Sequence, residues 1–161
     1  MTPASPAADG ARSVPPGMLP NITRLAAYVL CLDDDDRLLL VRLSDRTARP
    51  GYWTLPGGGM GFAEHPEDAA LRELTEETGL TGELTGLVTV DSIVRELDPP
   101  DAPAGTYHSV RIVYAATITG GALRDEPPGE SSDIAAWHRR EEIATLDLVE
   151  LGELAAHLAY G

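Results

Sequence analysis

Residues 58–80 of this protein read GGMGFAEHPEDAALRELTEETGL. The second half of this stretch predicts a helix over residues 66–79. Pro66 suits the first turn of a helix, the two acidic residues after it favour the positive end of the helix dipole, and Gly79 suits a left-handed C-terminal position. The sequence therefore marks both ends of this helix.

The predicted helix has an apolar side and an acidic side. At about 100° per residue, four residues gather on the side expected to pack against the protein: Ala70, Leu71, Leu74 and Thr78. A neighbouring arc presents Glu73, Glu76 and Glu77, whose like charges repel one another near the helix end that disfavours anions. A divalent cation would relieve this repulsion, because several close carboxylates with room for water match the way Mg²⁺ is usually held. A solvated acidic face partly neutralised by Arg72 explains the helix equally well.

Glycines directly before the helix favour the metal-binding interpretation. Gly57, Gly58, Gly59 and Gly61 let the backbone turn tightly and approach a ligand closely, because no Cβ intervenes. Such a loop can offer a carbonyl oxygen to a cation and amide groups to phosphate oxygens. We therefore expect a metal and phosphate site where this loop meets the helix.

The same stretch resembles the box motif of the Nudix hydrolases, G-x5-E-x7-R-E-U-x-E-E-x-G-U, in which U is a bulky aliphatic residue. All nine specified positions of the motif match between Gly58 and Leu80. A looser similarity covers residues 51–57 and 133–143. The resemblance implies an α/β Nudix fold, with a mixed β-sheet sandwiched between α-helices, in one domain over residues 21–161.

The resemblance also implies an activity and a metal site. The activity is hydrolysis of a diphosphate linkage in a nucleoside diphosphate derivative, with Mg²⁺, or Mn²⁺ in its place, as the cofactor. The implied metal ligands are Glu73, Glu76, Glu77 and the carbonyl oxygen of Gly57. Glu73 is in addition a candidate base toward the attacking water.

Other residues take supporting roles under the same resemblance. Arg72 would orient a neighbouring glutamate, and Glu64 would hold the loop to the helix through hydrogen bonds. Many family members add a carboxylate from a loop before the last strand, for which we favour Glu130 over the other three candidates, Asp125, Glu126 and Asp133. The expected substrate-binding residues are Gly58, Gly59, Tyr52 and Arg111, with His108 as a further candidate. Trp53 and Tyr107 fit a core position as well as a binding site.

Two other functions are compatible with the resemblance. One is a non-catalytic Nudix-fold module that binds nucleotides in a regulatory role, although such modules usually lack some motif glutamates and this chain keeps them all. The other is isopentenyl diphosphate isomerase, which uses an active-site cysteine. Cys31 is the only cysteine and lies among apolar residues of a predicted strand, where a small buried side chain is expected.

Composition limits the partners of the protein. Among 161 residues, 26 are acidic and 12 are basic, all of them arginine, which gives a formal net charge of −14. Such a surface repels nucleic acid polymers and anionic membranes, whereas a small nucleotide can bind through a bridging cation. ADP-ribose, other nucleotide sugars, dinucleoside polyphosphates and oxidised nucleoside triphosphates all stay open as substrates. A homodimer is also compatible with the resemblance.

Outside the box motif, we expect a proline-rich, mobile N-terminal tail over residues 1–20, with no signal peptide or membrane span, and hence a cytoplasmic location. Apolar runs rich in β-forming residues predict strands over residues 22–32, 37–43, 52–55, 83–94, 107–119 and 134–137. The four aspartates at residues 33–36 predict a solvated turn, and Gly120 with Gly121 predicts another turn. Residues 140–160 predict one or two helices. The loop over residues 96–105 is either a lid or a plain connector.

Overall fold

The computed structural model describes residues 21–97 and 104–161. Their strands form a four-stranded sheet in the order β4-β1-β6-β5, here the first sheet, and a three-stranded sheet in the order β3-β2-β7, here the second sheet. The elements are β1 (Asn21–Leu30), β2 (Leu38–Leu43), β3 (Trp53–Thr54), β4 (Gly57–Gly59), α1 (Pro66–Thr78), β5 (Leu80–Leu97), β6 (Gly105–Gly121), β7 (Ser132–His138), α2 (Arg140–Ile143) and α3 (Glu150–Tyr160). The predicted tail and residues 98–103 of the predicted loop lie outside the described residues.

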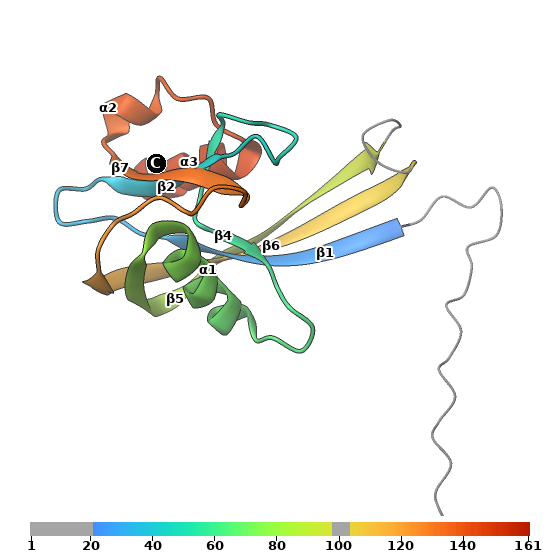
Figure 1. Ribbon diagram of the computed structural model, residues 1–161, viewed down its shortest axis with the longest axis horizontal. Helices are drawn as coiled ribbons and strands as arrows, with labels where there is room; N and C mark the ends of the chain where they lie inside the picture. Colours follow the sequence, from blue (N-terminus) through green and yellow to red (C-terminus); the bar gives the residue numbers. More distant parts are fainter. Residues whose placement is uncertain (1–20, 98–103) are drawn as a thin grey trace, which may run out of the picture.

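Strand β1 lies inside the first sheet, parallel to β6 and antiparallel to β4. Its neighbouring residues face opposite sides of the sheet. Ala27 and Val29 belong to a core shared with α1, whereas Ala26 and Tyr28 belong to a core shared with α3 and the second sheet. A strand buried on both faces needs a continuous apolar run, which β1 has. The first sheet is therefore mixed and lies between helices, as the sequence predicted (Figure 1).

Strands β5 and β6 are longer than predicted and pair with each other along almost their whole length. Figure 1 shows them extending, together with β1, beyond the rest of the protein. The predicted turn at Gly120 and Gly121 is wrong, because both residues lie inside β6. Gly121 has φ +81°, and a Cβ there would collide with the carbonyl of Gly79. Glycine thus lets the last residue of β6 pair with Leu80, directly after α1.

The C-terminal segment forms two helices, α2 and α3, within the range predicted for one or two. Helix α3 lies close to β3, since a Cβ at Gly152 would be 2.7 Å from the carbonyl oxygen of Trp53. Leu151 is buried, whereas Leu158 of the same helix is 39% exposed. Across the described part of the chain, no helix has the length and apolar character needed to cross a membrane.

Candidate active site

Helix α1 carries the predicted site, and its two ends form as the sequence predicts. The Nδ1 atom of His65, the N-cap residue, accepts a hydrogen bond at 3.3 Å from the amide two residues later. Gly79 is left-handed, with φ +73°, and its amide donates to the carbonyl of Thr75 at 2.9 Å. Arg124 adds a contact that the sequence did not predict, because it donates to the carbonyls of Thr75 and Glu76 at 3.3 Å each. This cation compensates the negative end of the helix dipole.

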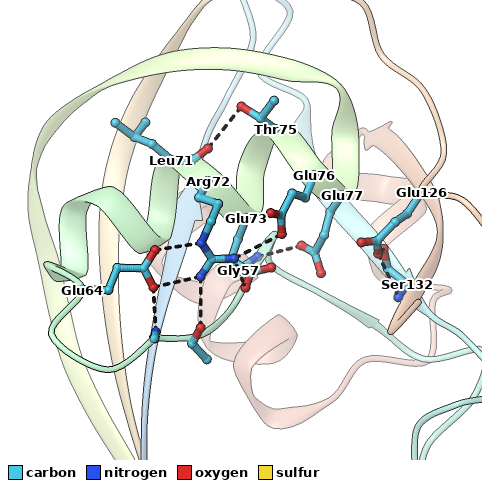
Figure 2. Close-up of polar contacts among 12 residues, drawn as sticks. Gly57, Glu64, Leu71, Arg72, Glu73, Thr75, Glu76, Glu77, Glu126 and Ser132 are labelled. Atoms are coloured by element: carbon cyan, nitrogen blue, oxygen red, sulfur yellow. Dashed lines mark hydrogen bonds and ion pairs between the residues drawn. The ribbon is translucent and has the colours of Figure 1, made fainter. Parts of the chain in front are cut away.

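Arg72 joins three carboxylates in the centre of the site (Figure 2). Its Nε and Nη2 atoms donate to the two oxygens of Glu64 at 2.7 and 3.0 Å. Its Nη1 atom donates to Oε1 of Glu73 at 2.9 Å and to Oε2 of Glu76 at 3.1 Å. Nη2 also reaches the carbonyl oxygen of Gly59 at 3.2 Å. Arg72 therefore fixes the positions of two candidate metal ligands relative to the glycine segment.

Glu64 links the loop before α1 to the helix. Besides its two contacts with Arg72, its Oε2 atom accepts a hydrogen bond from the amide of Gly61 at 2.7 Å. The Arg72 side chain, and after it the Gly61 amide, lower the pKa of Glu64 to about 2. These contacts have the geometry expected of a residue that holds loop and helix together.

Glu77 is buried, with 3% of its surface exposed, so the alternative of a solvated acidic face is wrong for this residue. Its Oε2 atom accepts a hydrogen bond from the amide of Gly57 at 2.8 Å. Burial, together with the nearby charge of Glu73, raises the pKa of Glu77 well above its usual range. Its side chain reaches from the last turn of α1 toward β4, and this direction removes it from solvent.

The glycine-rich segment before α1 begins as a strand, whereas a loop was predicted. Strand β4 pairs with residues 26–28 of β1, where Gly57 lies opposite Tyr28. Gly57 has φ +147°, and a Cβ at this position would lie 2.5 Å from Cδ1 of Tyr28. The absence of a Cβ thus allows the backbone of β4 to reach both β1 and the Glu77 carboxylate.

The next two glycines of β4 face opposite sides of the strand. A Cβ at Gly58 would lie 2.8 Å from the carboxyl carbon of Glu73, and a Cβ at Gly59 would lie 3.3 Å from Nη2 of Arg24. One face of β4 therefore meets the carboxylates of α1. The other face meets Arg24 of β1. Because β4 consists of glycines, only its backbone separates Arg24 from the carboxylates.

The three glutamates of α1 supply suitable oxygens for a cation without converging on one point. Within residues 21–97 and 104–161, no three or more His, Cys, Asp or Glu side chains surround a common metal position. Each glutamate nevertheless keeps one oxygen that accepts no hydrogen bond from those residues, namely Oε2 of Glu73, Oε1 of Glu76 and Oε1 of Glu77. Carboxylate oxygens are the ligands that Mg²⁺ prefers, so the donor set fits this ion.

Glu126 is a fourth carboxylate beside these glutamates. Ser132 holds its Oε2 atom through an amide at 3.2 Å and a hydroxyl at 2.6 Å (Figure 2). Burial first, and then neighbouring carboxylates that include Glu126, raise the pKa of Glu73 and Glu77. The charge of Glu126 thus acts directly on the two ligand candidates that are most removed from solvent.

Glu130, the carboxylate favoured from sequence, lines the same cavity as Glu76 and Glu126, but its side chain is exposed. The remaining two candidates have structural contacts instead. Asp125 accepts a hydrogen bond from the amide of Ala135 at 3.1 Å, and Asp133 pairs with Arg42. The geometry therefore favours Glu126, for which the sequence alone held no distinguishing signal.

A cavity of about 350 Å³ lies on the face of the first sheet opposite α1. Its lining includes Arg111, as expected for a substrate-binding residue, although this arginine is 6% exposed and its Nε donates to Asp91 at 2.9 Å. Tyr52, the other side chain expected to bind substrate, is not among the residues that line the cavity. Its ring packs against the guanidinium of Arg49, whose Cζ lies 4.3 Å from the ring centroid. Tyr107 lines the cavity and is thus a site candidate rather than a core residue.

Comparison with known proteins decides the family of the chain. Its sequence matches the NUDIX domain over residues 22–157. This chain belongs to the NUDIX family. The NUDIX domain is 33% identical to a protein named nucleoside triphosphatase NudI from Enterobacter sp. (strain 638), over 84% of this chain and 89% of that protein. It is 34% identical to human 8-oxo-dGDP phosphatase NUDT18, over 89% of this chain and 44% of the longer human protein.

Solved structures give the same result for the fold. The NUDIX domain is similar to a MutT NUDIX hydrolase from Burkholderia pseudomallei, with a TM-score of 0.69 and 25% identity, over 85% of this chain and 98% of that one. Relatives of the domain carry the names nucleoside triphosphatase, RNA pyrophosphohydrolase and ADP-ribose pyrophosphatase. The NUDIX domain is accordingly an enzyme that hydrolyses phosphoric anhydride bonds.

Cys31 gives no support to the isomerase alternative. The thiol is 1% exposed and packs in the core that includes Ala69 and Leu74 of α1. Burial raises its pKa to about 11, so it stays protonated at neutral pH. Its environment in this NUDIX domain is that of a small buried side chain, as predicted from the sequence.

Proposed function

We propose that this NUDIX domain cleaves a diphosphate linkage in a small nucleoside diphosphate derivative and depends on Mg²⁺, with Mn²⁺ as a substitute. The observation that carries the proposal is the group of four carboxylates, Glu73, Glu76, Glu77 and Glu126, gathered beside the glycine strand β4 with Arg72 as the countercharge. Close carboxylates of this kind repel one another unless a cation lies among them. Glycine amides next to them suit the phosphate of a substrate.

The metal would be held by the free oxygens of Glu73, Glu76 and Glu77, with the carbonyl of Gly57 as a further ligand. When bound, Mg²⁺ neutralises phosphate oxygens and lowers the pKa of a bound water. Arg72 keeps Glu73 and Glu76 in place by contacting only one oxygen of each. Glu64 fixes the loop that leads into α1, and the backbone of Gly58 and Gly59 would contact the substrate phosphates.

The reaction joins a water oxygen to one phosphorus while the bond from that phosphorus to the bridging oxygen breaks. The bridging oxygen leaves with the second phosphoryl group, and the water proton passes to a carboxylate. Glu73 is our candidate for this base, because its burial raises its pKa toward the range in which a carboxylate accepts a proton more readily.

A hydrolysis screen tests the proposal. The wild-type protein is incubated with ADP-ribose, another nucleotide sugar, a dinucleoside polyphosphate and an oxidised nucleoside triphosphate, with Mg²⁺ or with EDTA. We expect Mg²⁺-dependent release of a nucleoside monophosphate or phosphate from at least one class. Glu76→Gln should lower kcat by orders of magnitude, whereas Arg37→Gln, in the turn between β1 and β2, should not.

Other outcomes of this screen contradict the proposal. Full activity in EDTA would contradict the proposed dependence on Mg²⁺. Tight nucleotide binding with no cleavage under any condition would instead favour a regulatory nucleotide-binding module. The cytoplasmic location and the homodimer stay predictions from the sequence.

A further inference from the structure

The cavity on the far face of the first sheet gathers several arginines although the protein as a whole is strongly acidic. Its lining includes four arginines, Arg24, Arg49, Arg95 and Arg111, but only one carboxylate, Glu150. A volume of about 350 Å³ lies at the lower end of the range for small-molecule sites. One third of the basic residues of the chain thus meet in one hollow of a protein whose net charge is −14.

Three of these arginines have carboxylate partners. Arg111 pairs with Asp91 across β5 and β6. Arg95 and Arg49 both pair with Glu150 at the start of α3. Their positive charges are therefore partly neutralised by the protein itself.

Arg24 differs from the other three. Among residues 21–97 and 104–161 it forms no ion pair, and its polar neighbours are the hydroxyl groups of Tyr28 and Tyr107. The residue is half-buried, so solvent screens its charge incompletely. A half-buried guanidinium that is not paired with a carboxylate is well suited to bind a phosphate group.

The position of Arg24 connects this cavity to the carboxylate site. Its guanidinium lies against Gly59 of β4, while the preceding glycine of the same strand lies against Glu73. Tyr28, another lining residue, packs on Gly57, whose amide binds Glu77. A ligand in the cavity can therefore place one phosphate beside Arg24 while its diphosphate bridge extends across the glycine strand toward the carboxylates.

We propose that Arg24 is a specificity-determining residue: when the nucleoside of a substrate occupies this cavity, the Arg24 guanidinium binds the phosphate next to that nucleoside. The inference rests on the proposed function, because it assigns the non-reacting half of the same substrate. It predicts that the protein binds a nucleoside 5′-monophosphate, the product left after cleavage, much more tightly than the same nucleoside without phosphate.

Calorimetric titration of EDTA-treated protein tests this assignment. The probes are adenosine, guanosine and uridine, each compared with its 5′-monophosphate, and the proteins are wild type, Arg24→Gln, Arg24→Lys and the control Arg37→Gln. A charge-assisted hydrogen bond stabilises a complex by about 1.5–3 kcal/mol, so for at least one base the wild type should prefer the monophosphate by about tenfold or more. Arg24→Gln should lose this preference because only its affinity for the monophosphate falls. Arg24→Lys, which keeps the charge, should retain part of the preference.

A second readout separates this inference from the proposed function. In the Mg²⁺ assay, Arg24→Gln should raise KM about tenfold and leave kcat within about threefold of the wild type. The reason is that the contact between Arg24 and the phosphate contributes to substrate binding and does not involve the reacting water. Equal weakening of nucleoside and monophosphate by Arg24→Gln, or an unchanged preference, overturns the role of Arg24 even when the wild type hydrolyses its substrate. Absence of Mg²⁺-dependent hydrolysis by the wild type, with the monophosphate preference and its loss in Arg24→Gln intact, overturns the proposed function and leaves the anion site standing.

Discussion

The Oε2 atom of Glu77 accepts a hydrogen bond from the amide of Gly57 at 2.8 Å, and this contact ties the last turn of α1 to strand β4. The carboxylate is almost fully buried and lies near other negative charges, which raise its pKa. A buried carboxylate in this environment lowers the stability of the folded protein when no cation is bound. Its burial makes sense where a cation is to be bound close to the glycine backbone.

Glu77→Gln should therefore stabilise the protein in the presence of EDTA while removing its activity. Glutamine can still accept the Gly57 amide but carries no charge, so the free energy of unfolding at pH 7.5 should rise by about 1 kcal/mol or more. Urea denaturation measures this change. The matched variant Glu76→Gln alters an exposed carboxylate and should change stability by less than half as much. A destabilised Glu77→Gln protein would show that the charge itself holds α1 to β4.

Gly57→Ala should destabilise the fold strongly, because the added Cβ meets Tyr28 at 2.5 Å and the backbone has φ +147°. We expect the free energy of unfolding to fall by about 3 kcal/mol or more, because steric overlap and backbone strain act together. Gly51→Ala is the control, since Gly51 also has a positive φ, +86°, but nothing lies within 4 Å of its Cβ position. The Gly51→Ala change should lower the free energy of unfolding by about 1 kcal/mol. Equal effects in thermal denaturation would mean that β4 can move away from β1.

Stability in acid should depend on Glu64. Its pKa is lowered to about 2 by Arg72 and the Gly61 amide, whereas in the unfolded chain it is near 4.5. The folded protein thus holds this proton less tightly than the unfolded chain, so the stabilisation is complete above pH 4.5 and is lost as the pH falls toward 2. Unfolding free energies measured between pH 5 and 3 should fall less steeply in Glu64→Gln than in the wild type. Glu83→Gln, on the exposed part of β5, should follow the wild-type slope.

Glu126→Gln should lower kcat by about tenfold to a hundredfold, because Glu126 lies beside Glu73 and Glu77 and is held there by Ser132. Glu130→Gln should stay within about twofold of the wild type, a change too small to indicate a lost metal contact. Steady-state kinetics at saturating Mg²⁺ distinguish the two variants. The reverse order would restore Glu130 as the additional carboxylate of the site.

The sequence predicted the parts of this NUDIX domain that depend on local interactions. Helix α1 begins at Pro66 and ends before Gly79 because its capping residues and apolar spacing act within a few residues of one another. The approximate positions of the other strands follow in the same way from apolar runs and turn residues, whereas β4 was predicted as a loop and β5 and β6 are longer than predicted. The contacts of Arg72 with Glu73 and Glu76 also lie within one helical turn.

The tertiary structure decided the features that depend on distant parts of the chain. Glu77 becomes buried only because β4, 20 residues earlier, comes to lie beside α1. Glu126 reaches the site because its loop folds back and is held by Ser132, and Arg24 meets Gly59 because β1 and β4 pair. Periodicity and spacing carry no information about such long-range contacts. Local sequence patterns therefore define the bounds of α1 and the positions of its glutamates along the helix. Packing between distant segments decides which carboxylates are desolvated and which arginine lies beside the glycine strand.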